Sequence, residues 1–81
     1  MFMPEIKIYS TPWCTFCKME KEWLSRHGIE FEDINVAADR EAAEEMIEKT
    51  GQTGVPVTEI DGRIIIGFDK TRIKMILGIR E

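Results

Sequence analysis

The sequence contains only two cysteines, Cys14 and Cys17, and they stand three positions apart. A chain of 81 residues is expected to form a single domain over residues 1–81. A core of this size typically contributes only about 3 to 5 kcal/mol of stability, and small secreted domains usually add several disulfides. A bond between these two cysteines would close a loop too short to join distant parts of a fold. The pair therefore indicates chemistry rather than covalent reinforcement.

The charge and hydropathy of the chain argue against nucleic acid and membranes as partners. Acidic residues outnumber basic ones by 15 to 11 and no Lys/Arg cluster occurs, so we expect no nucleic-acid partner. No apolar run approaches the roughly 18 residues of a membrane span, and the first residues lack the features of a secretory signal. We therefore expect a cytoplasmic protein with no membrane partner. In that reducing compartment a CxxC pair is more often redox-active or metal-binding than structural.

Hydrophobic periodicity and breaker residues predict the secondary structure. The patterns predict strands over residues 5–10, 30–34, 55–60 and 63–67, and helices over residues 14–27, 39–50 and from Asp69 onward. Asp61-Gly62 favours a two-residue turn, which makes the last two strands an antiparallel hairpin. The order β-α-β-α-β-β-α implies an α/β fold in which a parallel unit and a hairpin form a mixed sheet flanked by helices.

The same periodicity predicts which helix faces are buried. The expected inner face of helix 14–27 consists of Phe16, Met19, Trp23 and Leu24, and that of helix 39–50 consists of Ala43, Met46, Ile47 and Thr50. The opposite face of helix 39–50 carries several glutamates, which we expect to be solvated.

Cys14 stands where the first strand ends and the first helix begins. Unpaired backbone N–H groups and the positive end of the helix dipole stabilise a thiolate at such a position. Such surroundings lower the pKa of a cysteine from its free value of about 8.5 into the range of about 3.5 to 7.5. The thiolate is the species that attacks disulfides. We therefore predict that Cys14 is the nucleophile and that Cys17, about one turn into the helix, is the resolving thiol. Trp13 either covers the sulfurs, or offers an apolar surface to a partner, or simply packs.

Metal binding is the competing interpretation of the CxxC. A structural zinc site needs four ligands, whereas the only further candidate, His27, lies ten residues along the same helix and about 15 Å away. We therefore predict no metal site within one chain. A metal or iron-sulfur carrier would have to share CxxC pairs across a dimer, whereas a redoxin is expected to be a monomer. A non-catalytic binding module is a third alternative, but it would not need two thiols.

Three segments of the chain resemble the glutaredoxin-like branch of the thioredoxin superfamily, which includes small redoxins that reduce ribonucleotide reductase. They are residues 9–17 (YSTPWCTFC), 54–56 (GVP) and 66–69 (IGFD). The resemblance implies a minimal glutaredoxin-like thioredoxin fold with a four-stranded mixed sheet. It also implies a thiol-disulfide oxidoreductase that acts on protein or low-molecular-weight disulfides, ribonucleotide reductase among them, without a tightly bound cofactor.

The resemblance also implies the roles of residues around the cysteines. Val55-Pro56 would be a cis peptide that faces the CxxC, with the Val55 backbone pairing with the substrate as a short strand. Phe68 and Asp69 occupy the positions that would hold the γ-glutamyl group of glutathione, and Asp69 would also cap the last helix.

Two departures from the glutathione-dependent relatives concern the electron donor. Those relatives usually carry a basic residue where this chain has Thr11, and a Gly-Gly pair where it has Ile66-Gly67. Either glutathione or a flavoprotein of the thioredoxin reductase type is therefore the expected donor.

Overall fold

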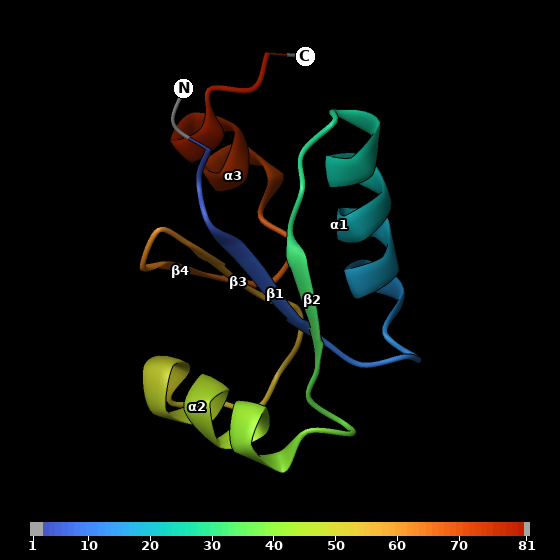
Figure 1. Ribbon diagram of the computed structural model, residues 1–81, viewed down its shortest axis with the longest axis vertical. Helices are drawn as coiled ribbons and strands as arrows, with labels where there is room; N and C mark the ends of the chain where they lie inside the picture. The colour runs from blue at the N-terminus through green and yellow to red at the C-terminus, as the bar shows by residue number, and fades with distance from the viewer. Residues whose placement is uncertain (1–2, 81) are drawn as a thin grey trace.

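The computed structural model describes residues 3–80, which form a four-stranded sheet with helices on both faces (Figure 1). In chain order the elements are β1 (Ile6–Ser10), α1 (Thr15–Arg26), β2 (Glu32–Asn35), α2 (Arg40–Thr50), β3 (Val57–Ile60), β4 (Arg63–Ile66) and α3 (Lys70–Leu77). The strand order is β2-β1-β3-β4, in which β1 is parallel to β2 and antiparallel to β3. Strands β3 and β4 form the antiparallel hairpin. The predicted element order and mixed sheet are confirmed.

Local interactions fix where several elements begin and end. The carboxylates of Asp39 and Asp69 accept hydrogen bonds from backbone N–H groups in the first turns of α2 and α3, as N-cap residues do. In the hairpin turn both Asp61 and Gly62 have positive φ, 48° and 87°, which is the requirement of a type I′ turn. Aspartate and glycine tolerate this region better than other residues, so Asp61-Gly62 sets the register of β3 and β4.

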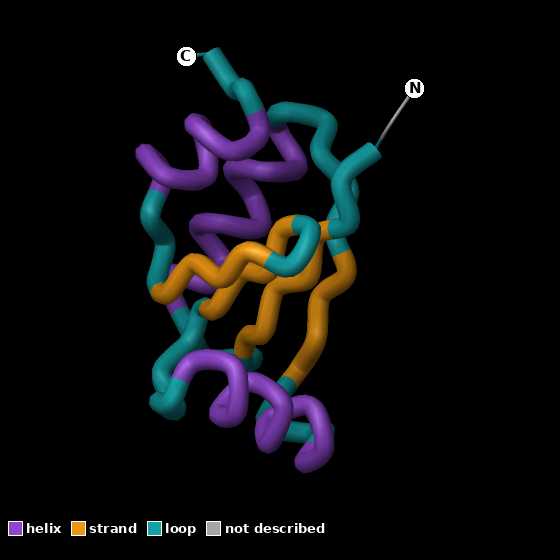
Figure 2. Tube along the Cα trace, turned by 90° about the vertical axis from the view of Figure 1, so that its left-hand side faces the viewer, coloured by secondary structure: helices purple, strands orange, loops and turns teal. Residues whose placement is uncertain are grey.

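The sheet is buried on both faces, and each face has its own core. Helices α1 and α3 cover one face and α2 covers the other (Figure 2). The first core contains Ile6, Ile8, Trp23, Leu24, Ile60, Ile65 and Ile73, and the second contains Tyr9, Ala42, Met46 and Val57. Alternation along β1 explains this arrangement, because Ile8 and Tyr9 point to opposite faces and both are fully buried.

Two predicted helix faces are partly wrong. In α1 the side chains of Phe16 and Met19 are exposed, and Cys17 and Glu20 are buried together with Trp23 and Leu24. In α2 the buried residues are Ala42 and Met46, whereas Ile47 is exposed. Each buried face is therefore rotated by about one residue from the apolar stripe on which the prediction rests. The glutamate face of α2 is exposed as predicted.

Two strands begin two residues later than predicted, and the other strand ends agree with the prediction to within one residue. Strand β2 begins at Glu32, and the chain before it is still joined to the end of α1, where Ile29 N–H donates to Leu24 O (3.0 Å). Strand β3 begins at Val57, directly after a cis bond between Val55 and Pro56.

The chain enters β1 and leaves α3 at the same end of the molecule, above the sheet in Figure 1. The turn that joins β1 to α1 lies away from this end. Within residues 3–80, no helix is long and apolar enough to cross a membrane.

Candidate active site

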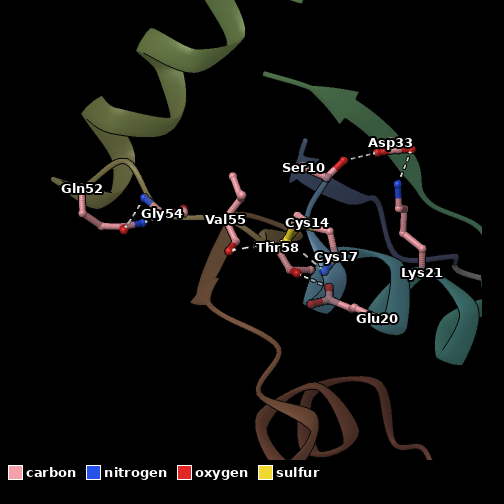
Figure 3. The surroundings of a disulfide bond; sticks show 10 residues. All are labelled: Ser10, Cys14, Cys17, Glu20, Lys21, Asp33, Gln52, Gly54, Val55 and Thr58. Atoms are coloured by element: carbon pink, nitrogen blue, oxygen red, sulfur yellow. Dashed lines mark hydrogen bonds and ion pairs between the residues drawn. A yellow bond between two sulfur atoms is a disulfide. The ribbon is translucent and has the colours of Figure 1, made fainter. Parts of the chain in front are cut away.

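Cys14 is the N-cap residue of α1, where the helix presents unpaired backbone N–H groups. Its Sγ accepts a hydrogen bond from the backbone N–H of Cys17 at 3.1 Å (Figure 3). Its own N–H donates to Thr11 O at 3.3 Å. The two cysteines form a disulfide with their Cα atoms 5.2 Å apart. The predicted position of the first sulfur at the head of the helix is confirmed.

The two sulfurs differ in their access to solvent. Cys14 is half-buried, whereas Cys17 is 0% exposed. A disulfide in solution can therefore approach Cys14, while Cys17 faces the interior behind it. The two thiols of the reduced pair would therefore differ in their access to a reaction partner.

The segment that contains Val55 and Pro56 lies against Cys14. Cys14 Sγ is 3.9 Å from the carbonyl oxygen of Val55, although 41 residues separate them in sequence. The Val55–Pro56 bond is cis, as the resemblance implies, and Pro56 is buried. Pro56 O accepts a hydrogen bond from Gly67 N–H at 2.8 Å, so the loop before α3 is joined to the same segment.

Two large apolar side chains close to Cys14 in sequence are exposed. Trp13 is 73% exposed and Phe16 is 62% exposed, one on either side of Cys14 in sequence. Of the three roles considered for Trp13, simple packing is therefore wrong, and the ring is accessible to a partner. Large exposed apolar side chains near a reactive group are typical of contact surfaces.

The other predicted binding residues lie on two loops. Thr11 is half-buried, and its Oγ1 has no hydrogen-bond partner among residues 3–80. The Phe68 ring packs against Trp23 with the centroids 5.8 Å apart, and Asp69 Oδ1 accepts the N–H of Arg72 at 3.2 Å. The helix-capping role of Asp69 is thus confirmed, while the contacts of Phe68 and Asp69 with glutathione stay predictions.

Glu20 is a buried acid that the sequence patterns do not single out. It is 0% exposed, and Oε2 accepts a hydrogen bond from the hydroxyl of Thr58, which is also buried (Figure 3). Its other oxygen, Oε1, has no hydrogen-bond partner within the described chain. Burial raises the pKa of Glu20 to about 7, against the opposing effect of the Thr58 hydrogen bond. Its spacing from Cys17 and Leu24, three and four residues, was the signal that could have placed it on the inner face.

Metal ligands are sparse in the part of the chain that the structure describes. Residues 3–80 contain no group of three or more His, Cys, Asp and Glu side chains that could hold a metal ion. His27 caps the far end of α1 from Cys14, and its ring packs edge-on against Trp23 at 5.0 Å.

Comparisons with known proteins cover both the CxxC and the Val55–Pro56 segment. The family model described as Glutaredoxin matches residues 6–65. An uncharacterized glutaredoxin-like 8.6 kDa protein in the rubredoxin operon of Clostridium pasteurianum is 51% identical over 72 residues, covering 89% of this chain and 96% of that protein. The glutaredoxin-like protein NrdH of Lactococcus lactis subsp. lactis is 40% identical over 63 residues, covering 78% and 86%. The glutaredoxin of Archaeoglobus fulgidus has a similar crystal structure, with a TM-score of 0.82, 25% identity and coverage of 93% and 87%.

Proposed function

Because the chain belongs to the glutaredoxin family, we propose that Cys14 attacks a substrate disulfide and that Cys17 resolves the mixed disulfide that results. The fold is the thioredoxin fold. The chain is a glutaredoxin-like thiol-disulfide oxidoreductase with Cys14 and Cys17 as its redox pair.

The proposed reaction has two exchange steps. The Cys14 thiolate attacks one sulfur of the substrate, an S–S bond forms to Cys14, and the other substrate sulfur leaves as a thiolate. The Cys17 thiolate then attacks Cys14 Sγ, and the second substrate thiolate leaves. The substrate gains two electrons and the protein keeps the Cys14–Cys17 disulfide. An external donor reduces this disulfide and completes the cycle.

The difference between the two cysteines is the observation that carries this proposal. Cys14 combines partial exposure with a helix N-cap position, and the Cys17 N–H donates to its sulfur. Backbone N–H groups at a helix end stabilise negative charge, and Cys17 has no access from outside.

Protein disulfides are the substrates that the surface favours. Val55 O lies beside Cys14 Sγ, so an extended substrate segment would run along the Val55 backbone there. Trp13 and Phe16 would contact the substrate around its disulfide. Ribonucleotide reductase, a substrate of the small redoxins that this chain resembles, is one candidate. We further propose that the protein works in the cytoplasm as a monomer.

The electron donor is either glutathione or a flavoprotein of the thioredoxin reductase type. Thr11 supplies no positive charge where glutathione-dependent relatives usually carry a basic residue, and this absence favours the flavoprotein. Oxidised protein mixed with each donor in turn, with the appearance of free thiols followed, would show which one reduces it faster. Faster reduction by glutathione would overturn the preference for a flavoprotein.

Replacing the two cysteines one at a time tests the mechanism. With Cys17→Ser we expect a stable mixed disulfide on Cys14, detected by mass spectrometry after reaction with a protein disulfide. With Cys14→Ser we expect disulfide reduction to fall by more than about 100-fold, because the remaining thiol is buried. Unchanged activity of Cys14→Ser would contradict the assignment.

The same preparations also test the metal alternative. A carrier that shares CxxC pairs across a dimer would show visible absorption and bound metal after anaerobic purification. It would also run as a dimer in size-exclusion chromatography. For the oxidoreductase we expect a colourless monomer.

A further inference from the structure

Glu20 lies on the same face of α1 as Cys17, one helical turn further along. Residues three apart in a helix have Cβ atoms about 5 to 6 Å apart, so their side chains are neighbours. Both residues are 0% exposed, and Figure 3 shows Glu20 near Cys17 and Thr58, next to the disulfide. The carboxyl group therefore shares a water-excluded space with the resolving thiol.

The surroundings of Glu20 offer little compensation for a negative charge. Strand β3 presents the Thr58 hydroxyl, which donates to Oε2, and Oε1 has no hydrogen-bond partner among residues 3–80. The neighbouring Glu59 is bound instead by Lys49, at 2.6 Å, and belongs to the other face of the sheet. A buried carboxyl with an unpaired oxygen is costly, so its presence calls for a role.

The other elements packed on this side of the sheet contribute apolar groups. Strand β1 contributes Ile8 opposite Thr58, and α3 contributes Ile73, both of them fully buried. On α1 itself, Lys21 turns to Asp33, with its Nζ 2.9 Å from Oδ2. Burial and the Thr58 hydrogen bond therefore govern the protonation of Glu20. The titratable neighbour on its own helix face is Cys17.

We propose that Glu20 accepts the proton of Cys17 during the resolving step. In the mixed disulfide, the Cys17 thiol gives its proton to the Glu20 carboxylate and becomes a thiolate. The thiolate attacks Cys14 Sγ, the Cys14–substrate bond breaks, and the substrate leaves as a thiolate that is protonated by solvent. When the donor later reduces the Cys14–Cys17 disulfide, Cys17 leaves as a thiolate and recovers the proton from Glu20.

The ionisation of Glu20 suits this task better than that of an ordinary carboxylate. A buried thiol loses its proton reluctantly, and a base with a pKa near the working pH is the most effective acceptor. The pKa of Glu20 is about 7, raised by burial from the usual value of 4.5.

The inference rests on the proposed function, because a resolving step exists only if Cys17 attacks the mixed disulfide. A stopped-flow experiment separates the two steps. Reduced protein is mixed with less than one equivalent of dithiobis(nitrobenzoate), whose two thionitrobenzoate groups absorb visible light once released. Attack by Cys14 releases the first group and attack by Cys17 releases the second.

Glu20→Gln is the principal variant, because it keeps the size of the side chain and removes the base. We expect the second release to slow by about 100-fold at pH 7, while the first release changes by less than about twofold. In the wild type the second release should accelerate as Glu20 ionises and then level off. Glu22→Gln removes the same charge from an exposed position of α1, and should leave both releases unchanged.

Thr58→Val keeps the test decisive if Glu20→Gln does not fold. It removes the hydroxyl that stabilises the Glu20 carboxylate, so the pH dependence of the second release should move to higher pH. A purely structural role would not move this profile. The proposal is overturned if Glu20→Gln releases the second group at the wild-type rate, or if Thr58→Val leaves the profile unmoved. If Cys17 does not resolve the mixed disulfide at all, the proposed function itself fails, and the result is different. Wild type and Cys17→Ser would then each release only the first thionitrobenzoate group.

Discussion

Cys14 and Glu20 lie six residues apart, yet the same helix gives them opposite electrostatic surroundings. Cys14 caps the helix, where the N–H of Cys17 points at its sulfur and negative charge is stabilised. Glu20 lies in the interior, where all backbone N–H groups of the helix are already used and charge is destabilised. One short segment thereby favours an ionised thiol at the surface and a readily protonated carboxyl beneath it.

The first consequence at the residue scale concerns the reactivity of Cys14. In Cys17→Ser, which leaves a single thiol, we expect iodoacetamide to modify Cys14 rapidly at neutral pH, because the helix end stabilises the thiolate. The rate should reach its plateau well below pH 8.5. The unfolded variant in urea is the control, and its rate should rise only near that pH. A folded protein that follows the unfolded profile would refute the role of the helix end.

The second consequence is a pH-dependent stability that originates at Glu20. Its pKa is about 7 when folded and near 4.5 when unfolded, so between these values the folded state holds more protons. Stability therefore falls as pH rises through this window, by up to about 3 kcal/mol, and the contribution is absent below pH 4.5. In urea unfolding of oxidised protein, the stability of Glu20→Gln relative to wild type should rise from pH 4.5 to pH 8. A difference that stays constant with pH would show that Glu20 ionises normally.

At the scale of elements, aspartates begin two of the three helices. Asp39 and Asp69 each accept a backbone N–H from the first turn of α2 and α3. Asp69 also lies next to Gly67, whose N–H binds Pro56 O, so its helix starts beside the active-site loop. The same residue can therefore influence both the stability of α3 and the binding of a donor.

Substitutions at Asp69 should separate its two roles. We expect Asp69→Ala to lower the free energy of unfolding by about 1 kcal/mol, whereas Asp69→Asn, which still caps a helix, should change it little. If Asp69 also contacts glutathione, both variants should slow reduction by glutathione. Asp39→Ala is the matched control, with a similar loss of stability and an unchanged rate. Equal destabilisation by Asp69→Asn and Asp69→Ala would argue against capping as the cause.

The elements themselves were largely predictable from sequence, but the orientation of α1 was not. Alternation in β1, the aspartate caps and the Asp61-Gly62 turn act through local chemistry, which the sequence displays directly. The apolar stripe of α1 runs from Phe16 through Met19 to Trp23, but the helix turns Phe16 and Met19 outward and buries Glu20. Hydrophobicity does not distinguish a face that packs from a face that binds a partner. The cis bond at Val55–Pro56 came from family resemblance alone, because a proline does not specify its isomer.

At the scale of the whole molecule, two cores hold the helices against the sheet, while two large apolar side chains near Cys14 stay outside them. The first core anchors α1 through Trp23 and Leu24, so its N-terminus is held against the Val55–Pro56 segment. Trp13 and Phe16 then remain exposed beside Cys14. Burial is thus used to position the reactive sulfur, and the surface around it stays free for a partner.

Trp13 should therefore matter for large substrates and little for small ones. We expect Trp13→Ala to lower kcat/KM for a protein disulfide about tenfold, the effect of losing one of the few aromatic residues that carry most of the binding energy at an interface. For a small disulfide the change should stay within about twofold. Met75→Ala, at an equally exposed apolar position of α3, should leave both rates unchanged. Equal losses on both substrates after Trp13→Ala would point to a disturbed active site.

The chain enters β1 and leaves α3 at one end of the molecule, away from the turn that carries Cys14 (Figure 1). A tether attached at this end of the molecule would therefore leave the turn between β1 and α1 unobstructed. The domain is therefore suited to being fixed to an electrode or appended to another domain. In either arrangement the CxxC pair could still exchange electrons with freely diffusing partners.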